Sequence, residues 1–176
     1  MAKIDETRPF IPVNIAVMTI SDSRTEDDDA SGATLIARLQ AAGHHLAARA
    51  IVRDDIESIT KQLAAWIEDD HIDAVITTGG TGLTGRDVTP EALRAVIDKE
   101  IEGFGELFRM LSYDIIGPST IQSRAMAGVA AGTYLFALPG SPSACRDAWD
   151  LILAHQLDNR ARPCNFVELM PRLKER

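Results

Sequence analysis

Short apolar runs alternate with helical patterns along this chain, and polar loops connect them. Residues 13–20 (VNIAVMTI) are almost entirely apolar, which is typical of a strand that is buried on both faces. Residues 45–52, 74–78 and 133–138 predict three further strands. Because strands and helices alternate, the pattern predicts an α/β fold with a mostly parallel sheet and helices on both of its faces.

The segments between these strands carry apolar residues at helical spacing. Gly43 follows the first of these stripes and is a good candidate for its C-cap. The stripe in residues 104–111 suits either the core or a subunit contact, and we expect the core. Helices are predicted around Leu35, Ile36 and Leu39; Ile59, Leu63, Trp66 and Ile67; Phe104, Leu107, Phe108 and Leu111; and over about 141–153.

Length and composition restrict the class of protein. A chain of 176 residues suits one domain. No apolar run approaches the roughly 20 residues that a membrane span requires, and the first residues lack the apolar stretch of a signal peptide. We therefore expect a cytoplasmic protein. Cys145 and Cys164 lack metal-site spacing and are expected to be reduced thiols, and the scattered histidines are expected to have structural or surface roles.

The formal net charge of −8 limits the ligands that the chain can bind. General nucleic-acid binding needs a basic surface, so this class is excluded. The overall charge would also repel a phosphate-bearing ligand. Backbone amides, a few arginines and a metal ion must therefore supply any attraction locally.

The strongest candidate for such a site is the glycine-rich loop after the third predicted strand. Ligands of parallel α/β sheets bind at loops that follow the carboxyl ends of strands, and here these are residues 21–31, 79–90 and 139–143. The second loop lets backbone amides approach an anion closely, because four of its seven residues 79–85 are glycines. A plain glycine turn is the alternative, but a turn needs fewer glycines. The phosphate-binding candidates are Gly79, Gly80, Thr81, Gly82 and the guanidinium of Arg86.

Two common nucleotide motifs do not fit this loop. The spacing of Gly80, Gly82 and Gly85 matches the dinucleotide-binding pattern, but that pattern belongs to the first strand–helix turn. Here the next helix begins only near Pro90, with Thr89 and Pro90 as its expected N-cap and first helical residue. A P-loop is excluded because no Gly-Lys-Ser/Thr sequence occurs.

Two aspartates beside this loop have alternative interpretations. Asp87 would repel a phosphate unless a cation lies between them, so it suggests a magnesium ligand, and the alternative is a cap or loop brace. Asp54 follows the second strand and could complete that metal site. However, Asp54 and Glu57 also have the spacing of a capping box at a helix start, so the residues alone leave both roles open.

The other two loops offer weaker candidates. Arg24 could reach a ligand phosphate or belong to a solvated loop. Ser141 and Pro142 predict an N-cap and a first helical residue, where a second anion contact is possible.

Taken together, these motifs resemble those of the MoaB/MogA family of molybdenum-cofactor biosynthesis proteins. The match covers about residues 13–168, and the tail over residues 156–166 resembles the MoaB branch. The chain departs from the family pattern at Arg53, where proline often precedes the first acidic residue. The shared motifs are residues 19–24 (TISDSR), Asp29-x-Ser31-Gly32, 77–82 (TTGGTG), 86–91 (RDVTPE), 103–106 (GFGE), Ser119, Ser123-Arg124 and 138–142 (LPGSP).

The resemblance implies a three-layer αβα molybdopterin-binding fold with a mostly parallel sheet, formed by residues 13–176 after an N-terminal extension over residues 1–12. It implies magnesium-dependent adenylylation of molybdopterin by ATP, with Asp54 and Asp87 as catalytic and metal-binding residues. It further implies a homotrimer or a hexamer, with other pathway proteins as possible partners. Ser21, Ser119, Arg124 and Ser141 would lie on the pterin side.

Three functional hypotheses follow. An adenylyltransferase would release pyrophosphate only when ATP, magnesium and molybdopterin are present together. A carrier paralogue would bind the pterin without consuming nucleotide, and Asp87→Asn would not affect that binding. A structural oligomer would keep the glycine loop without using it.

Overall fold

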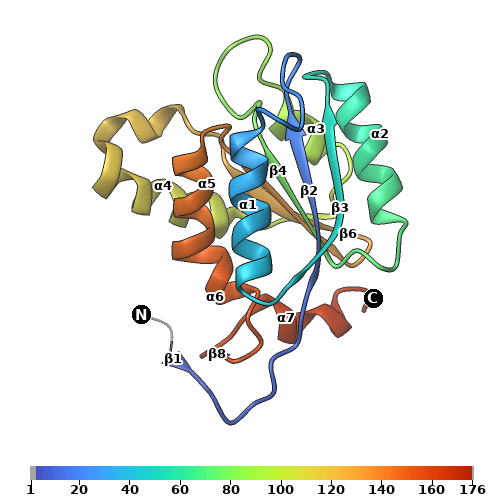
Figure 1. Ribbon diagram of the computed structural model, residues 1–176, viewed down its shortest axis with the longest axis vertical. Helices are drawn as coiled ribbons and strands as arrows, with labels where there is room; N and C mark the ends of the chain where they lie inside the picture. Colours follow the sequence, from blue (N-terminus) through green and yellow to red (C-terminus); the bar gives the residue numbers. More distant parts are fainter. Residues whose placement is uncertain (1–2, 176) are drawn as a thin grey trace.

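A computed structural model describes residues 3–175 and shows a six-stranded sheet between two layers of helices (Figure 1). The strand order is β3-β2-β4-β7-β6-β5. The first four strands of this order are parallel, and β6 and β5 run antiparallel to their neighbours. The predicted α/β class with a mostly parallel sheet is therefore confirmed. The strands are β2 (Asn14–Ile20), β3 (His45–Val52), β4 (Ala74–Thr78), β5 (Lys99–Glu100), β6 (Met126–Ala130) and β7 (Thr133–Leu138).

The sequence prediction placed the parallel strands accurately and missed the antiparallel ones. The ranges predicted for β3, β4 and β7 agree with the structure, and β2 begins one residue later than predicted. The missed strand β6 (MAGVA) is short and contains two alanines and Gly128, which have low strand propensity. Gly128 is required there because a Cβ atom would clash with the side chain of Ile97.

The helices cover both faces of the sheet. Helices α1, α4 and α5 pack on one face, and α2 and α3 pack on the other (Figure 1). Gly43 follows α1 with a φ of 89°, as expected of a C-cap glycine. The helical segments are α1 (Ala30–Ala41), α2 (Ile56–Ile67), α3 (Thr89–Arg94), α4 (Glu102–Ile116), a 3₁₀ helix (Gly117–Gln122), α5 (Pro142–Ala148), a π-helical turn (Trp149–Leu153), α6 (Ala154–Gln156), α7 (Phe166–Leu169) and a final 3₁₀ turn (Met170–Arg172).

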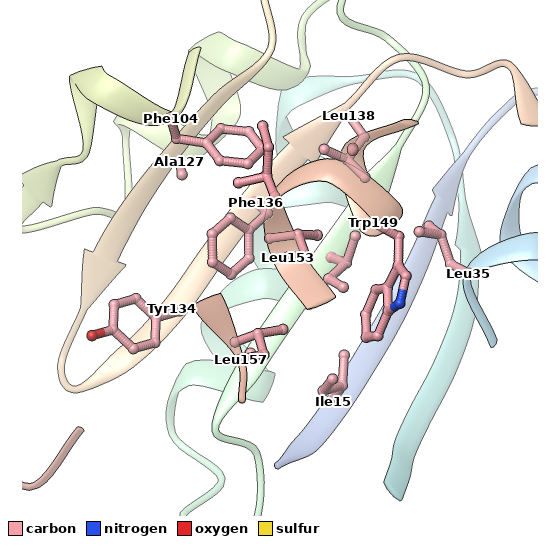
Figure 2. Close-up of a cluster of buried hydrophobic side chains, with 14 of the residues drawn as sticks. Ile15, Leu35, Phe104, Ala127, Tyr134, Phe136, Leu138, Trp149, Leu153 and Leu157 are labelled. Atoms are coloured by element: carbon pink, nitrogen blue, oxygen red, sulfur yellow. The ribbon is translucent and has the colours of Figure 1, made fainter. Parts of the chain in front are cut away.

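The central strands are apolar on both faces because helices bury both. In β2, Ile15 and Val17 face the α1, α4 and α5 layer, whereas Met18 faces α2 and α3. Figure 2 shows the larger cluster, where the aromatic rings of Phe104 and Phe136 lie with centroids 5.3 Å apart. Burying such side chains contributes about 1.5–3 kcal/mol each. This packing holds the strand ends, and so the loops that follow them, in fixed positions.

Most of the apolar stripe in residues 104–111 of α4 belongs to the core, as expected. Phe104 and Phe108 are buried, and Leu111 packs against the same cluster from a partly buried position. Leu107, however, is 38% exposed. The later part of α4 and the 3₁₀ helix after it also expose several large apolar side chains: Met110, Tyr113, Ile115, Ile116 and Ile121.

A second, two-stranded sheet holds the first described residues against the end of the chain. In it, β1 (Lys3–Ile4) pairs antiparallel with β8 (Ala161–Arg162). Asn159 also accepts a hydrogen bond from the amide of Ile11 (2.9 Å) and donates one to the carbonyl of Pro9 (2.9 Å). No helix within residues 3–175 is long and apolar enough to span a membrane.

His44 has the structural role that was expected of the histidines. It is 4% exposed, lies between the rings of Phe10 and Trp149, and its Nδ1 accepts a hydrogen bond from the amide of Val13 (3.1 Å). Burial lowers the pKa of His44 and outweighs the opposing charge of Asp158. The folded protein therefore keeps this imidazole neutral.

This lowered pKa predicts a pH dependence of stability. The unfolded chain binds the His44 proton more readily, so the stabilisation is present above about pH 6.5 and is lost as the pH falls through the lower folded value. The pH dependence of the unfolding free energy in urea should therefore flatten near pH 6 in His44→Asn, whose amide oxygen can still accept from Val13. His71→Asn, at a 95% exposed side chain, should keep the original slope. Equal slopes in both variants would contradict the role of His44.

Candidate functional site

The three predicted loops meet at the carboxyl edge of the parallel strands. The amide of Ser21 donates to the carbonyl of Val52 (2.9 Å), which joins the first loop to the end of β3. The amide of Gly79 donates to the carbonyl of Leu138 (3.1 Å), which joins the glycine loop to the end of β7. The first loop therefore lies beside the end of β3, which Asp54 follows, and the glycine loop lies beside the third loop, which follows β7.

The first two glycines of the loop are required by the turn itself. Gly79 has a φ of 106° and Gly80 a φ of 64°, a region that other residues rarely adopt. A Cβ atom at Gly79 would clash with the carbonyl oxygen of Ile20, and one at Gly80 would clash with the hydroxyl of Thr89. The loop thus runs in contact with its neighbours.

The side chain of Arg124 holds the glycine loop in place through hydrogen bonds to its carbonyl groups. Its Nε donates to the carbonyl of Gly82 (2.7 Å), its Nη2 donates to the carbonyl of Asp87 (2.6 Å), and its Nη1 pairs with Glu91. Its backbone amide also donates to the carbonyl of Thr81 (3.0 Å). The guanidinium therefore fixes the course of the loop, whereas the resemblance assigned it to the pterin side.

Asp87 is tied into the same loop. Its Oδ2 accepts hydrogen bonds from the amide (2.8 Å) and the hydroxyl (2.6 Å) of Thr84. Burial opposes ionisation of Asp87, but these bonds and one from the amide of Gly82 outweigh it and lower the pKa of this carboxyl. Asp87 is thus the loop brace that was one of its two predicted roles, and its negative charge remains available to a cation.

Asp54 has a buried carboxylate oxygen without a partner. Among the described residues, no hydrogen-bond donor contacts its Oδ1, which lies against the backbone of Gly80. Burial raises the pKa of Asp54, and the negative charges of Asp22 and Asp87 raise it further. A divalent cation would compensate both effects, so the site fits a magnesium ion.

The capping-box interpretation of Asp54 is wrong. Asp55, not Asp54, is the N-cap of α2, and its carboxylate accepts hydrogen bonds from the amide (2.7 Å) and the hydroxyl (2.8 Å) of Ser58. The prediction was displaced by one residue, because consecutive aspartates satisfy the capping preference equally well in sequence. The carboxylate of Asp54 is therefore not used in capping the helix.

The N-cap predicted for the next helix was also displaced by one residue. Val88 is the N-cap of α3, and the hydroxyl of Thr89, already inside the helix, donates to the carbonyl of Gly79 (2.8 Å). Helix α3 has only six residues. Thr89 thus anchors the glycine loop to the helix.

A cavity of about 440 Å³ opens beside the glycine loop. One part of its lining consists of Gly80, Thr81, Gly82 and Asp87 together with the start of α5. The other part comes from α4 and the residues after it and combines apolar with polar side chains. The lining there includes Phe108, Ile115, Ile116, Thr120, Gln122 and Ser123.

Of the serines assigned to the pterin side, only Ser141 reaches this cavity. It is the N-cap of α5, as predicted, and its hydroxyl accepts from the amide of Ala144 (3.2 Å). Ser119 is exposed and does not line the cavity. The hydroxyl of Ser21 accepts from the amide of Arg24 (3.2 Å), whose guanidinium in turn donates to the carbonyl of Asp28 (2.9 Å), so both brace their own loop.

Sequence reasoning missed two sets of site residues. Asp22 lies in the motif of residues 19–24 and pairs with Arg86, yet only the fold shows that the two loops touch. Thr120 and Gln122 line the cavity from a segment whose sequence has no distinctive pattern, next to Ser123 of the Ser123-Arg124 motif. The motif positions of Asp22 and Ser123 were usable signals, whereas Thr120 and Gln122 had none.

Within residues 3–175, no three His, Cys, Asp or Glu side chains gather as a ready metal site. A magnesium ion held by Asp54 and Asp87 would therefore need oxygen ligands from water and from a phosphate. Magnesium commonly binds in this way, through one or two carboxylates plus substrate oxygens.

Comparisons with known proteins agree with the fold. Residues 16–159 match the family described as a probable molybdopterin binding domain. Molybdenum cofactor biosynthesis protein B of Escherichia coli (strain K12) is 55% identical over 157 residues, which cover 89% of this chain and 92% of that relative. A crystal structure of molybdenum cofactor biosynthesis protein B has a TM-score of 0.86 at 40% identity, covering 96% of this chain and all (100%) of that one. The tungsten cofactor synthesizing protein MoaB from Pyrococcus furiosus has a TM-score of 0.75 at 32% identity, covering 93% and 98% of the two chains.

The geometry of the glycine loop predicts that two glycine-to-alanine substitutions reduce the free energy of unfolding by unequal amounts. Gly79→Ala should reduce the free energy of unfolding by at least about 2 kcal/mol, because it combines a disfavoured φ with a backbone clash. A Cβ at Gly85 meets nothing within 4 Å, so Gly85→Ala should stay within about 0.5 kcal/mol of the parent. Urea unfolding measures both, and equal costs would contradict the described turn.

Proposed function

Because the chain belongs to the molybdopterin-binding family of molybdenum cofactor biosynthesis proteins, we propose that it binds molybdopterin and adenylylates it with magnesium-ATP, releasing pyrophosphate. One observation carries the proposal. The glycine loop lines a cavity with an apolar part and also lies against the unpartnered, buried oxygen of Asp54. A planar organic group thus has a pocket beside the loop, and a cation has a ligand next to the same loop.

In the proposed phosphoryl-type transfer, different groups of the site bind the pterin phosphate and the cation. Such a reaction needs mainly positioning and charge neutralisation. The amides of Gly80 and Thr81 would hold the terminal phosphate of the pterin at the mouth of the cavity. An oxygen of that phosphate would attack the α-phosphorus of ATP, and the bond to the departing pyrophosphate would break. Magnesium, when bound, supplies positive charge between the two anionic reactants.

Asp54 and Asp87 would hold this cation from two different loops. Asp87 is kept ionised by Thr84, so it is ready to bind a cation at neutral pH. Asp54 is destabilised as an anion in the free protein, so cation binding relieves an existing penalty. Arg86, at the end of the loop, would contact the nucleotide phosphates.

A carrier that holds the pterin without chemistry is the second candidate. It is favoured by the fact that the side chains of Arg124 and Asp87 already have partners within the protein. In that case the cavity would be used, and the carboxylates would serve only the loop.

Pyrophosphate release distinguishes the two. The purified protein should release pyrophosphate only with molybdopterin, ATP and magnesium together, and Asp87→Asn and Asp54→Asn should each reduce kcat by roughly 100-fold or more. Asp55→Asn is the matched control, because asparagine still caps α2 and the residue is not assigned to the metal. Saturable pterin binding without turnover would instead support the carrier.

We further propose that the chain assembles as a homotrimer or hexamer through the end of α4 and the 3₁₀ helix. Met110, Tyr113, Ile115, Ile116 and Ile121 are each more than half exposed there, and clustered apolar side chains of this kind mark association surfaces. A single exposed apolar residue elsewhere needs no such explanation.

This assembly predicts that a charge on the surface dissociates it. Ile121→Glu, at an 80% exposed position, should shift the mass measured by light scattering toward the monomer. Ile11→Glu, at a 50% exposed position in the N-terminal segment, should leave the mass unchanged. A monomeric parent protein, or an Ile121→Glu variant of unchanged mass, would contradict the proposed surface.

A further inference from the structure

Asp22 lies between two residues of the site that come from different loops. Its Oδ1 accepts a hydrogen bond from the amide of Asp54 (3.3 Å), and its Oδ2 forms an ion pair with Arg86. The first loop, the end of β3 and the glycine loop are thus connected through one carboxylate. None of the three side chains lines the cavity, so this cluster lies outside it.

The ion pair holds Arg86 on a carboxylate of the same chain. The side chains of Arg86 and Asp22 are 66% and 48% exposed, and ion pairs at such positions contribute little to stability. A phosphate can offer the guanidinium two parallel hydrogen bonds and a larger charge. Arg86 can therefore move from Asp22 to an arriving polyphosphate at small cost.

Such a transfer leaves uncompensated negative charge behind. Once Arg86 leaves, Asp22 faces Asp54, whose buried oxygen already has no donor, and Asp87 lies close enough to influence the same carboxyl. These carboxylates would repel a phosphate nearby unless a cation replaced the guanidinium. When polyphosphate without a metal takes Arg86 from Asp22, the charge of Asp22 stays uncompensated, whereas the cation of the magnesium complex compensates it.

We propose that Asp22 competes with a phosphate ligand for the guanidinium of Arg86. It thereby makes the site select polyphosphate complexed with a divalent cation over the free anion. In the free protein Asp22 occupies Arg86. When a metal–polyphosphate complex binds, the cation takes over the charge of the carboxylates and Arg86 transfers to phosphate. This role rests on the proposed function, since it concerns the nucleotide side of that site, but it acts on binding and is measurable without molybdopterin.

The test is calorimetric titration of the full chain with inorganic pyrophosphate, with and without magnesium. Asp22→Asn keeps an oxygen acceptor for the amide of Asp54 and removes only the charge. We expect it to tighten metal-free pyrophosphate binding about five- to tenfold and to reduce the improvement that magnesium brings. Asp27→Asn is the matched control, because it removes the same charge from an exposed position of the same loop. Asp27→Asn should change neither the metal-free affinity for pyrophosphate nor the improvement by magnesium by more than about twofold.

A double-mutant cycle with Arg86→Gln separates competition from a structural effect. If Asp22 acts by occupying Arg86, its gain should disappear in the Asp22→Asn/Arg86→Gln double variant. A gain that persists without Arg86, a gain equal to that of Asp27→Asn, or no pyrophosphate binding in any variant would overturn the proposal. Failure of the adenylylation proposal has a different signature, namely no pyrophosphate release from ATP and molybdopterin by the unmodified protein.

Discussion

The close backbone contact at Gly79 is the constraint on which the site depends. There the glycine loop leaves β4, touches the carbonyl oxygen of Ile20, and hydrogen-bonds to Leu138 at the end of β7. The contact is possible because position 79 has no side chain and adopts a positive φ. It lies where three neighbouring parallel strands end, so that the loops after β2, β4 and β7 are close together there. Because Gly79 lacks a Cβ atom, the glycine loop can pass between these neighbours and adjoin both the cavity and Asp54.

The charges around this loop show a consistent division. On the cavity side, Arg124 is used to hold backbone carbonyls, and the ligand would meet amides, hydroxyls and an apolar wall. Around Arg86, carboxylates exceed cationic groups, and Asp54 carries the energetic penalty. In a protein with a net charge of −8, a cation that arrives with an anion strengthens the binding of that anion there. The same imbalance underlies both the proposed catalysis and the proposed selectivity of Asp22.

Much of this arrangement could be predicted because the local physics is strong. The bounds of β4 and β7 follow from apolar runs that are buried on both faces, and Gly43 and Ser141 act as the helix caps that their residue types favour. Errors arose where two neighbouring residues suit one role. Asp55 caps α2 instead of Asp54, and α3 starts one residue earlier than its proline suggested. The antiparallel strand β6 was missed because its small residues are selected by close packing against Ile97, which no local pattern records.

Sequence alone was sufficient for the class of fold, the order of the main strands and the glycine loop, because these depend on periodicity and on the properties of single residues. Only the tertiary structure could show that Arg124 holds the loop, that Asp22 holds Arg86, and that Asp54 has an oxygen without a partner. These are relations between residues as many as 64 positions apart. They depend on which strands lie side by side, and the geometry of a parallel sheet decides that rather than the neighbours of each residue in the chain.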